Sequence, residues 1–212
     1  TFHAAWLLKL NPDDSSADDE LRDAHQKLLA ENNGKQPPVV AVVSETLQLA
    51  DTRDIVMAFR ANPAESLAYL KAEALKCVDK SSWRRKTKLA IAALGMGDAE
   101  LALDVCTFEN RPDPEQRTLF IDEFRRWKVD LKVVLATVEN SDSPALRSGI
   151  CLAVGQVSGE TLADVDKEAW KSLASQWFVE KADTSTHSAA GWLLRQWQMP
   201  VPAVSATLAI AS

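Results

Sequence analysis

The sequence predicts an all-α fold in which antiparallel helix pairs stack into a short right-handed α-α superhelix. Three observations support this prediction: a composition that favours helices, apolar residues with a helical period, and a helix signature that recurs along the chain. The 212 residues include only seven glycines and one tyrosine. This composition is more typical of helical proteins than of β-sandwiches.

The recurring signature interleaves small residues with large aliphatic ones. Its four copies are Phe2–Leu8, Lys88–Gly95, Ser148–Gly155 and His187–Leu194. Repetition of such a unit is typical of stacked helical repeats, in which each unit buries its apolar face against the next.

The spacing of the copies indicates the type of repeat. The segment 187–194 lies 40 residues beyond 147–154, and the helix start at Pro114 precedes the one at Pro144 by 30 residues. Units of this length match a two-helix repeat of the HEAT/armadillo type, and the Trp, Gly, Tyr and Pro pattern of tetratricopeptide repeats is absent. We therefore expect one HEAT-like helical-repeat domain over residues 1–212. Because the chain begins at Thr1 without an initiator Met, we expect it to be a fragment of a larger protein.

Helix-start signals define the elements. One such signal is a capping side chain, then a proline at the first helical position, then a carboxylate near the exposed amides, as in Asn62-Pro63-Ala64-Glu65. The same order occurs in Asp113-Pro114-Glu115-Gln116, and a shorter form occurs in Ser143-Pro144. Val39–Val43 has strand propensity but no partner strand nearby, so we place it in a helix. The predicted helices are roughly 1–10, 17–31, 38–49, 52–60, 64–78, 82–95, 98–108, 114–127, 129–138, 144–156, 163–180, 187–198 and 202–210.

Apolar residues with a period of 3.6 predict the buried face of each helix. The stripes are Leu67, Leu70, Ala74 and Cys77; Phe120, Phe124 and Trp127; Leu146, Ile150, Ala153 and Val154; and Ala190, Leu193, Leu194 and Trp197. In the segment 165–180, Ala169, Leu173 and Trp177 lie on one side, and Trp170 and Phe178 widen the stripe. That breadth indicates a helix contacted on two sides. Most of the seven tryptophans should be packing residues whose indole N–H donates to a nearby carbonyl.

Composition, charge and cysteine content limit the classes of protein to which this chain can belong. A 46% hydrophobic and 25% charged chain is ordinary for a soluble globular protein. The net charge of −6 disfavours a large phosphate-binding face, and residues 1–34 form an acidic end with seven carboxylates against three cations.

The three cysteines, Cys77, Cys106 and Cys151, lack the spacing of metal ligands or of a redox pair. This indicates buried thiols in a reducing compartment, so we expect a cytoplasmic location. The longest late apolar stretch is too short to span a bilayer.

Residues that could perform chemistry have simpler structural explanations. His3 and His187 occupy equivalent positions of the recurring signature, which suggests a structural role such as a bond to a loop carbonyl, and His25 fits the edge of the core. Asp183, His187 and Ser188 contain the residue types of a hydrolase triad, but their spacing on one helix start does not place base, nucleophile and oxyanion hole together. Gly95-Met96-Gly97 fits a helix end and turn. We therefore predict no catalytic residue, no metal site and no cofactor.

One local feature opposes the overall charge: the basic run Arg84, Arg85, Lys86 and Lys88, with Lys80 and Trp83 beside it. Cations at a helix start are mildly unfavourable against the helix dipole, so they can have an external purpose. We predict a solvated face that pairs with the acidic first helix pair and serves as a candidate protein-interaction surface. The alternative is a nucleic-acid-binding face. Arg125 and Arg126 are similarly explained as cations flanking a core tryptophan.

Several phrases of the sequence resemble one known family. They are Pro112–Phe124, Ser141–Gly149, Thr186–Trp197 and, at the start, Thr1–Ala5. They resemble the helical-repeat region of large planctomycete-type bacterial proteins that begin with a serine/threonine protein kinase domain and end with a formylglycine-generating-enzyme-like (sulfatase-modifying factor) domain. The resemblance is clearest over residues 110–200 and fainter over 1–105.

The resemblance implies a connecting or scaffolding role rather than an activity. Neither the kinase loops nor the cysteines of the C-terminal enzyme occur in this chain, so no catalytic residue carries over. We expect a non-catalytic segment whose partner is another protein or the flanking domains of its own chain. Two alternatives stay open: the nucleic-acid-binding domain, and an enzyme with its site in the superhelix groove.

Overall fold

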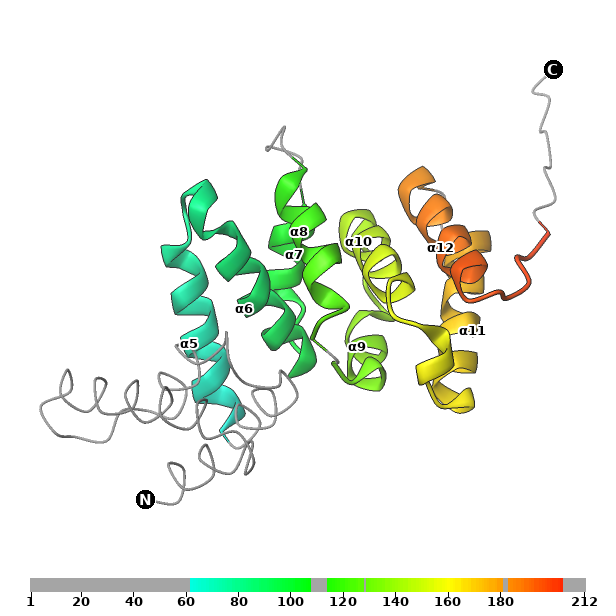
Figure 1. The fold of residues 1–212 in the computed structure, drawn as a ribbon, viewed down its shortest axis with the longest axis horizontal. Coiled ribbons are helices and arrows are strands. Elements are labelled where there is room, and N and C mark those ends of the chain that lie inside the picture. The colour runs from blue at the N-terminus through cyan, green and yellow to red at the C-terminus, as the bar shows by residue number, and fades with distance from the viewer. Residues whose placement is uncertain (1–61, 108–113, 128, 181–182, 204–212) are drawn as a thin grey trace, which may run out of the picture.

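The computed structural model describes residues 62–107, 114–127, 129–180 and 183–203, and all regular structure in these ranges is helical (Figure 1). The eight α-helices are α5 (Pro63–Lys76), α6 (Trp83–Gly95), α7 (Glu100–Cys106), α8 (Glu115–Phe124), α9 (Leu131–Val138), α10 (Pro144–Gly155), α11 (Asp164–Glu180) and α12 (Thr184–Gln196). Two short 3-10 turns, η1 (Lys80–Ser82) and η2 (Gly159–Thr161), precede α6 and α11. The predicted all-α class is confirmed for these residues.

Each helix predicted between 64 and 198 is present, with ends shifted by a few residues. The predicted helices at 1–10, 17–31, 38–49 and 52–60 lie outside the described residues. The helix predicted at 202–210 is wrong at its start, because residues 202 and 203 are not helical, and its remainder is also outside the described part.

The capping predictions have mixed outcomes. Ser143 caps α10 as expected, since its Oγ accepts the Leu146 N–H at 3.3 Å. Asn62 does not cap α5 with its side chain; its amide donates to Glu65 instead. Pro114 precedes α8 rather than occupying its first turn.

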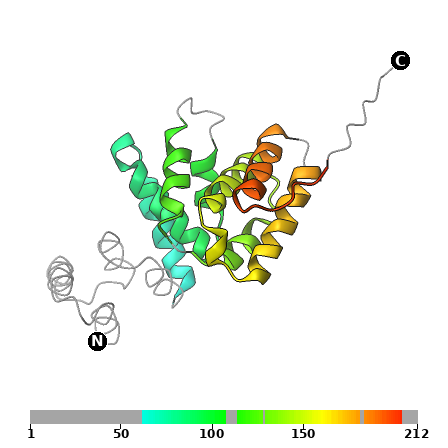
Figure 2. The same cartoon turned by 45° about the vertical axis from the view of Figure 1, so that its right-hand side comes forward.

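Even-numbered helices pack one against the next along the chain. The helix α6 packs on α8, α8 on α10, and α10 on α12, while α5, α7 and α11 pack against members of this row. Figures 1 and 2 show the helices side by side from α5 at one end to α11 and α12 at the other. This order is the one expected for stacked helix pairs, and the superhelical twist stays a prediction.

The predicted apolar stripes form the core. Their members are buried except Leu67, which is partly buried, and Ala169, which is exposed. Ala169 was wrongly placed on the buried side of α11, because Trp170, Leu173 and Trp177 already fill the side that packs on neighbouring helices and Ala169 is left exposed. The indole N–H of Trp170 donates to the Leu131 carbonyl at 3.1 Å and that of Trp197 to Val157 at 2.9 Å, as predicted.

Glycines of the recurring signature permit the close approach of helices. A Cβ added at Gly155 would lie 2.2 Å from the Cζ3 of Trp192, and one at Gly149 would lie 2.5 Å from the Sγ of Cys106. The predicted turn after α6 is also confirmed, since Gly97 has φ of 91° and donates its N–H to Leu94. The small residues are therefore required by packing between helices.

The three cysteines are buried and carry free thiols, as predicted. Burial raises the pKa of Cys106 and of Cys151 to about 12, so both are protonated at neutral pH. None of the helices in the described ranges is long and apolar enough to cross a membrane.

Candidate functional site

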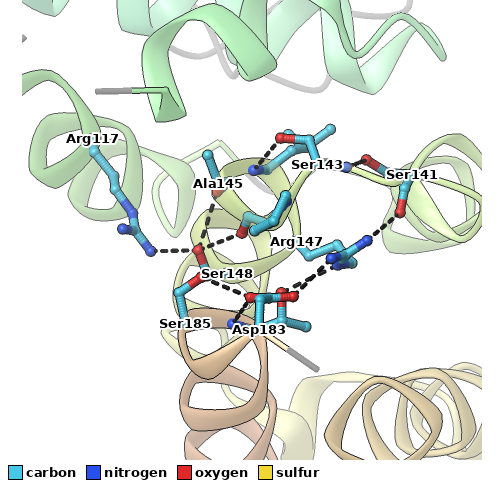
Figure 3. A network of polar contacts seen from close by, with 11 residues as sticks. Arg117, Ser141, Ser143, Ala145, Arg147, Ser148, Asp183 and Ser185 are labelled. Atoms are coloured by element: carbon cyan, nitrogen blue, oxygen red, sulfur yellow. Dashed lines mark hydrogen bonds and ion pairs between the residues drawn. The ribbon is translucent and has the colours of Figure 1, made fainter. Parts of the chain in front are cut away.

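Two groups of charged side chains stand out in the described residues. One is the α10–α12 junction, formed by Arg147 with Ser141, Asp183 and Thr186 (Figure 3). The other is the α6 basic edge, which consists of three cations at the start of α6 and the carboxylates that they contact on neighbouring helices. The cations are Arg84, Arg85 and Lys86, and the carboxylates are Glu123, Glu73 and Asp104.

The junction is built around a buried arginine. The Arg147 side chain is only 5% exposed, and its guanidinium donates Nε to the Thr186 hydroxyl at 3.2 Å, Nη1 to the Ser141 carbonyl at 2.9 Å and Nη2 to Asp183 at 2.8 Å. Three partners for one buried guanidinium satisfy the condition under which a buried charge is tolerated. Arg147 thus joins α10 to the start of α12.

Asp183 has two structural roles in this junction. Its carboxylate accepts the Thr186 N–H at 2.6 Å and thereby caps α12, which is why the helix begins at Thr184, earlier than predicted. Burial alone would raise the pKa of Asp183, but hydrogen bonds from Thr186, Arg147 and Ser185 hold it well below its ordinary value. The carboxylate is therefore ionised at neutral pH.

A similar contact joins α8 to α10. Arg117, 30 residues before Arg147, donates Nη2 to the Ser148 hydroxyl at 2.9 Å, and Ser148 donates to the Pro144 carbonyl at 2.7 Å. Figure 3 shows both arginines reaching from their own helix to the next even-numbered one. The repeated arginines thus link successive helices.

The structure does not assemble the triad considered from the sequence. His187 lies stacked on the Phe178 ring with centroids 4.0 Å apart, and its Nδ1 is 2.8 Å from the Phe178 carbonyl. Asp183 faces Arg147 and the α12 amides instead. A carbonyl partner for His187 is confirmed, but it belongs to Phe178 in α11 and not to a loop as predicted. His3 and His25 lie outside the described residues.

The side chains of the basic run contact three different helices. Arg84 Nη1 lies 3.0 Å from Glu123 on α8, Arg85 Nη2 lies 2.9 Å from Glu73 on α5, and Lys86 Nζ lies 2.5 Å from Asp104 on α7. These carboxylates are not the acidic first helix pair named in the prediction, which is outside the described residues.

Exposure divides the four predicted interaction residues. The side chains of Arg84 and Arg85 are 59% and 53% exposed, whereas Lys86 is 13% exposed and is drawn inward to Asp104. Lys88 is half-buried one turn after Arg84. The accessible part of the run is therefore centred on the two arginines.

Sequence reasoning missed the carboxylates that organise this edge. Glu73 and Glu123 are buried, and each contacts a second cation: Lys76 reaches Glu73, and Arg126 Nη1 lies 3.1 Å from the same Glu123 oxygen as Arg84. Both glutamates flank the apolar stripes, so only their position beside buried residues signalled a structural role. The core placement of Trp127 is confirmed, with exposed Arg125 and Arg126 before it.

No group of three or more His, Cys, Asp or Glu side chains suited to a metal ion occurs in the described ranges. The arrangement instead offers structural ion pairs and an exposed pair of arginines. No protein-family model, curated protein or solved structure matches this chain.

Proposed function

We propose that this chain is a non-catalytic scaffold and protein-interaction segment that positions flanking domains, or a docked partner, within a larger cytoplasmic protein. The observation that supports this proposal is that charged side chains bridge helices instead of converging on a common space. Arg117, Arg147, Arg84, Arg85 and Lys86 each contact a different helix from their own.

Two further features support a stacked, HEAT-like architecture. Even-numbered helices pack in chain order, and two glycines of α10 stand where neighbouring helices come close, Gly149 at Cys106 of α7 and Gly155 at Trp192 of α12. Stacked repeats of this type present extended surfaces to partners. The resemblance of residues 110–200 to planctomycete-type kinases favours a bacterial parent protein in which the segment connects domains.

The test uses the parent protein and the isolated 212-residue chain. Lysine cross-linking of the parent is expected to join exposed lysines such as Lys76 and Lys132 to sequences outside residues 1–212. Replacing residues 62–203 by a flexible linker should change the cross-links that join the flanking sequences to one another and leave any kinase activity toward a free peptide intact. An activity that requires a residue of 62–203 would contradict the proposal.

The nucleic-acid alternative has a separate signature. A protein with six to ten phosphate contacts loses about a thousandfold in affinity or more between roughly 50 and 200 mM salt. We expect the chain to bind duplex DNA weakly at low salt and with a shallow dependence. Tight binding with a steep salt slope would favour the alternative, because it requires more unneutralised cations than the ion pairs at α6 leave.

A further inference from the structure

We infer that the α6 basic edge binds a short acidic peptide segment through Arg84 and Arg85. This inference rests on the proposed interaction function and names the chemistry of the partner. It begins from the two buried carboxylates, Glu73 and Glu123, beside which the arginines lie.

Each buried carboxylate is shared by two cations. Arg84 and Arg126 both contact Oε1 of Glu123, at 3.0 and 3.1 Å, and Arg85 and Lys76 contact the two oxygens of Glu73. One negative charge therefore faces two positive charges at each site. A local positive excess remains, although the whole chain carries −6.

The geometry leaves the arginines able to receive another anion. A guanidinium has five N–H donors in a planar fork, and the contact with glutamate uses one nitrogen of each arginine. More than half of each arginine side chain is exposed. Because the buried glutamates already hold the arginines in position, less side-chain freedom is lost when a second carboxylate binds.

The extent of the edge favours a short peptide over a nucleic acid. On either side of the arginines, Lys80 pairs with Glu115 and Lys86 pairs with Asp104, and Lys88 is half-buried, so the exposed positive excess along α6 is short. Nucleic-acid binding requires a longer track of cations. Arg84 and Arg85 are adjacent in the chain and contact carboxylates on different helices, α8 and α5, so a segment that binds both needs at least two Asp or Glu side chains.

The test is fluorescence anisotropy of the full chain with a labelled peptide of about twelve glutamates, at about 150 mM salt where long-range attraction is screened. The variant Arg84→Gln with Arg85→Gln leaves Arg126 and Lys76 to pair the buried glutamates. It is expected to weaken binding about tenfold or more. A control that removes the same charge elsewhere, Lys132→Gln with Arg195→Gln, should weaken binding less than about twofold.

A second variant keeps the inference falsifiable if the first is poorly folded. Glu123→Gln retains an acceptor of the same shape but removes the competing charge, so peptide affinity should rise severalfold. Equal losses in the two double variants, a loss in Glu123→Gln, or no binding by the natural chain would overturn the inference. Tighter binding of single-stranded DNA of matched charge would also overturn it. Absence of peptide binding would leave the scaffold proposal standing, because cross-linking of the parent protein tests that proposal separately.

Discussion

The α10–α12 junction and the α6 basic edge use the same residue types in different ways. At the junction, buried Arg147 donates hydrogen bonds to Asp183, Thr186 and a backbone carbonyl. At the edge, Arg84 and Arg85 each contact one carboxylate and stay more than half exposed. Burial and the number of partners, not the presence of an ion pair, therefore distinguish the structural Arg147 from the exposed Arg84 and Arg85.

The energetic consequences of the two environments differ. Removing one member of a buried, hydrogen-bonded pair leaves an uncompensated group and costs about 3–5 kcal/mol, whereas exposed pairs contribute about 0–1 kcal/mol. Of the two sites, the α10–α12 junction should therefore contribute more to the free energy of unfolding, and the exposed pairs of the α6 basic edge should contribute little.

The largest effect is expected for Arg147→Met. The substitution keeps the apolar stem but removes the Arg147 hydrogen bonds to Asp183, Thr186 and the Ser141 carbonyl, and Asp183 keeps its bonds from Thr186 and Ser185. The free energy of unfolding, measured by urea denaturation, should fall by about 3 kcal/mol. Arg84→Gln is the comparison, and its loss should stay below about 1 kcal/mol because Arg126 still pairs Glu123. Similar losses in the two variants would contradict the distinction.

The next effect is expected for Gly155→Ala. Alanine normally stabilises a helix relative to glycine by about 1 kcal/mol. Here its Cβ would lie 2.2 Å from Trp192 on α12, so we expect a loss of about 2 kcal/mol from overpacking. The double variant Gly155→Ala with Trp192→Leu tests the cause by thermal denaturation. It should be more stable than the sum of the single effects predicts, and simple additivity would refute the contact.

A smaller effect concerns acid stability. The folded-state pKa of Asp183 lies below its ordinary value of 3.8. The stabilisation from its ionised form is therefore complete above the ordinary pKa and is lost as pH falls from about 4 toward the lower folded value. Asp183→Asn keeps a capping side chain but should flatten this part of the stability–pH curve. An unchanged slope between roughly pH 5 and 2 in urea titrations would show that Asp183 is not responsible.

The smallest change is expected in thiol chemistry. Because burial raises the pKa of Cys106 and Cys151 to about 12, neither thiol should react with iodoacetamide at pH 8 in the folded chain. Their modification, followed by mass spectrometry, should accelerate in urea together with unfolding. Rapid labelling of the native chain would show that α7 and α10 open more readily than their packing indicates.

The sequence predicted the helices well because their signals are local. Proline and serine before α10 and a 3.6-residue apolar period need no tertiary context, and the stripe of Phe120 and Phe124 is buried as predicted. The start of α12 was missed because the helix was placed from His187, where the recurring signature begins, and Asp183 was not recognised as its cap.

The polar contacts were less predictable because they join residues far apart in the chain. Arg147 and Asp183 are separated by 36 positions. The only sequence signal was the 30-residue spacing of the helix starts at Pro114 and Pro144, which also separates Arg117 from Arg147. Glu73 and Glu123 each pair with a cation three residues later and with an arginine of α6, and no local pattern specifies the α6 partner.

We expect the α10–α12 junction to stabilise the packed helices and the α6 basic edge to bind a partner. Urea stability and glutamate-peptide affinity, measured in two variants of the full chain, test both expectations together. Arg147→Met should lose about 3 kcal/mol of stability and keep peptide affinity within about twofold. Arg84→Gln with Arg85→Gln should lose about tenfold in affinity and less than about 1 kcal/mol in stability. Parallel losses of stability and affinity in both variants would contradict the account.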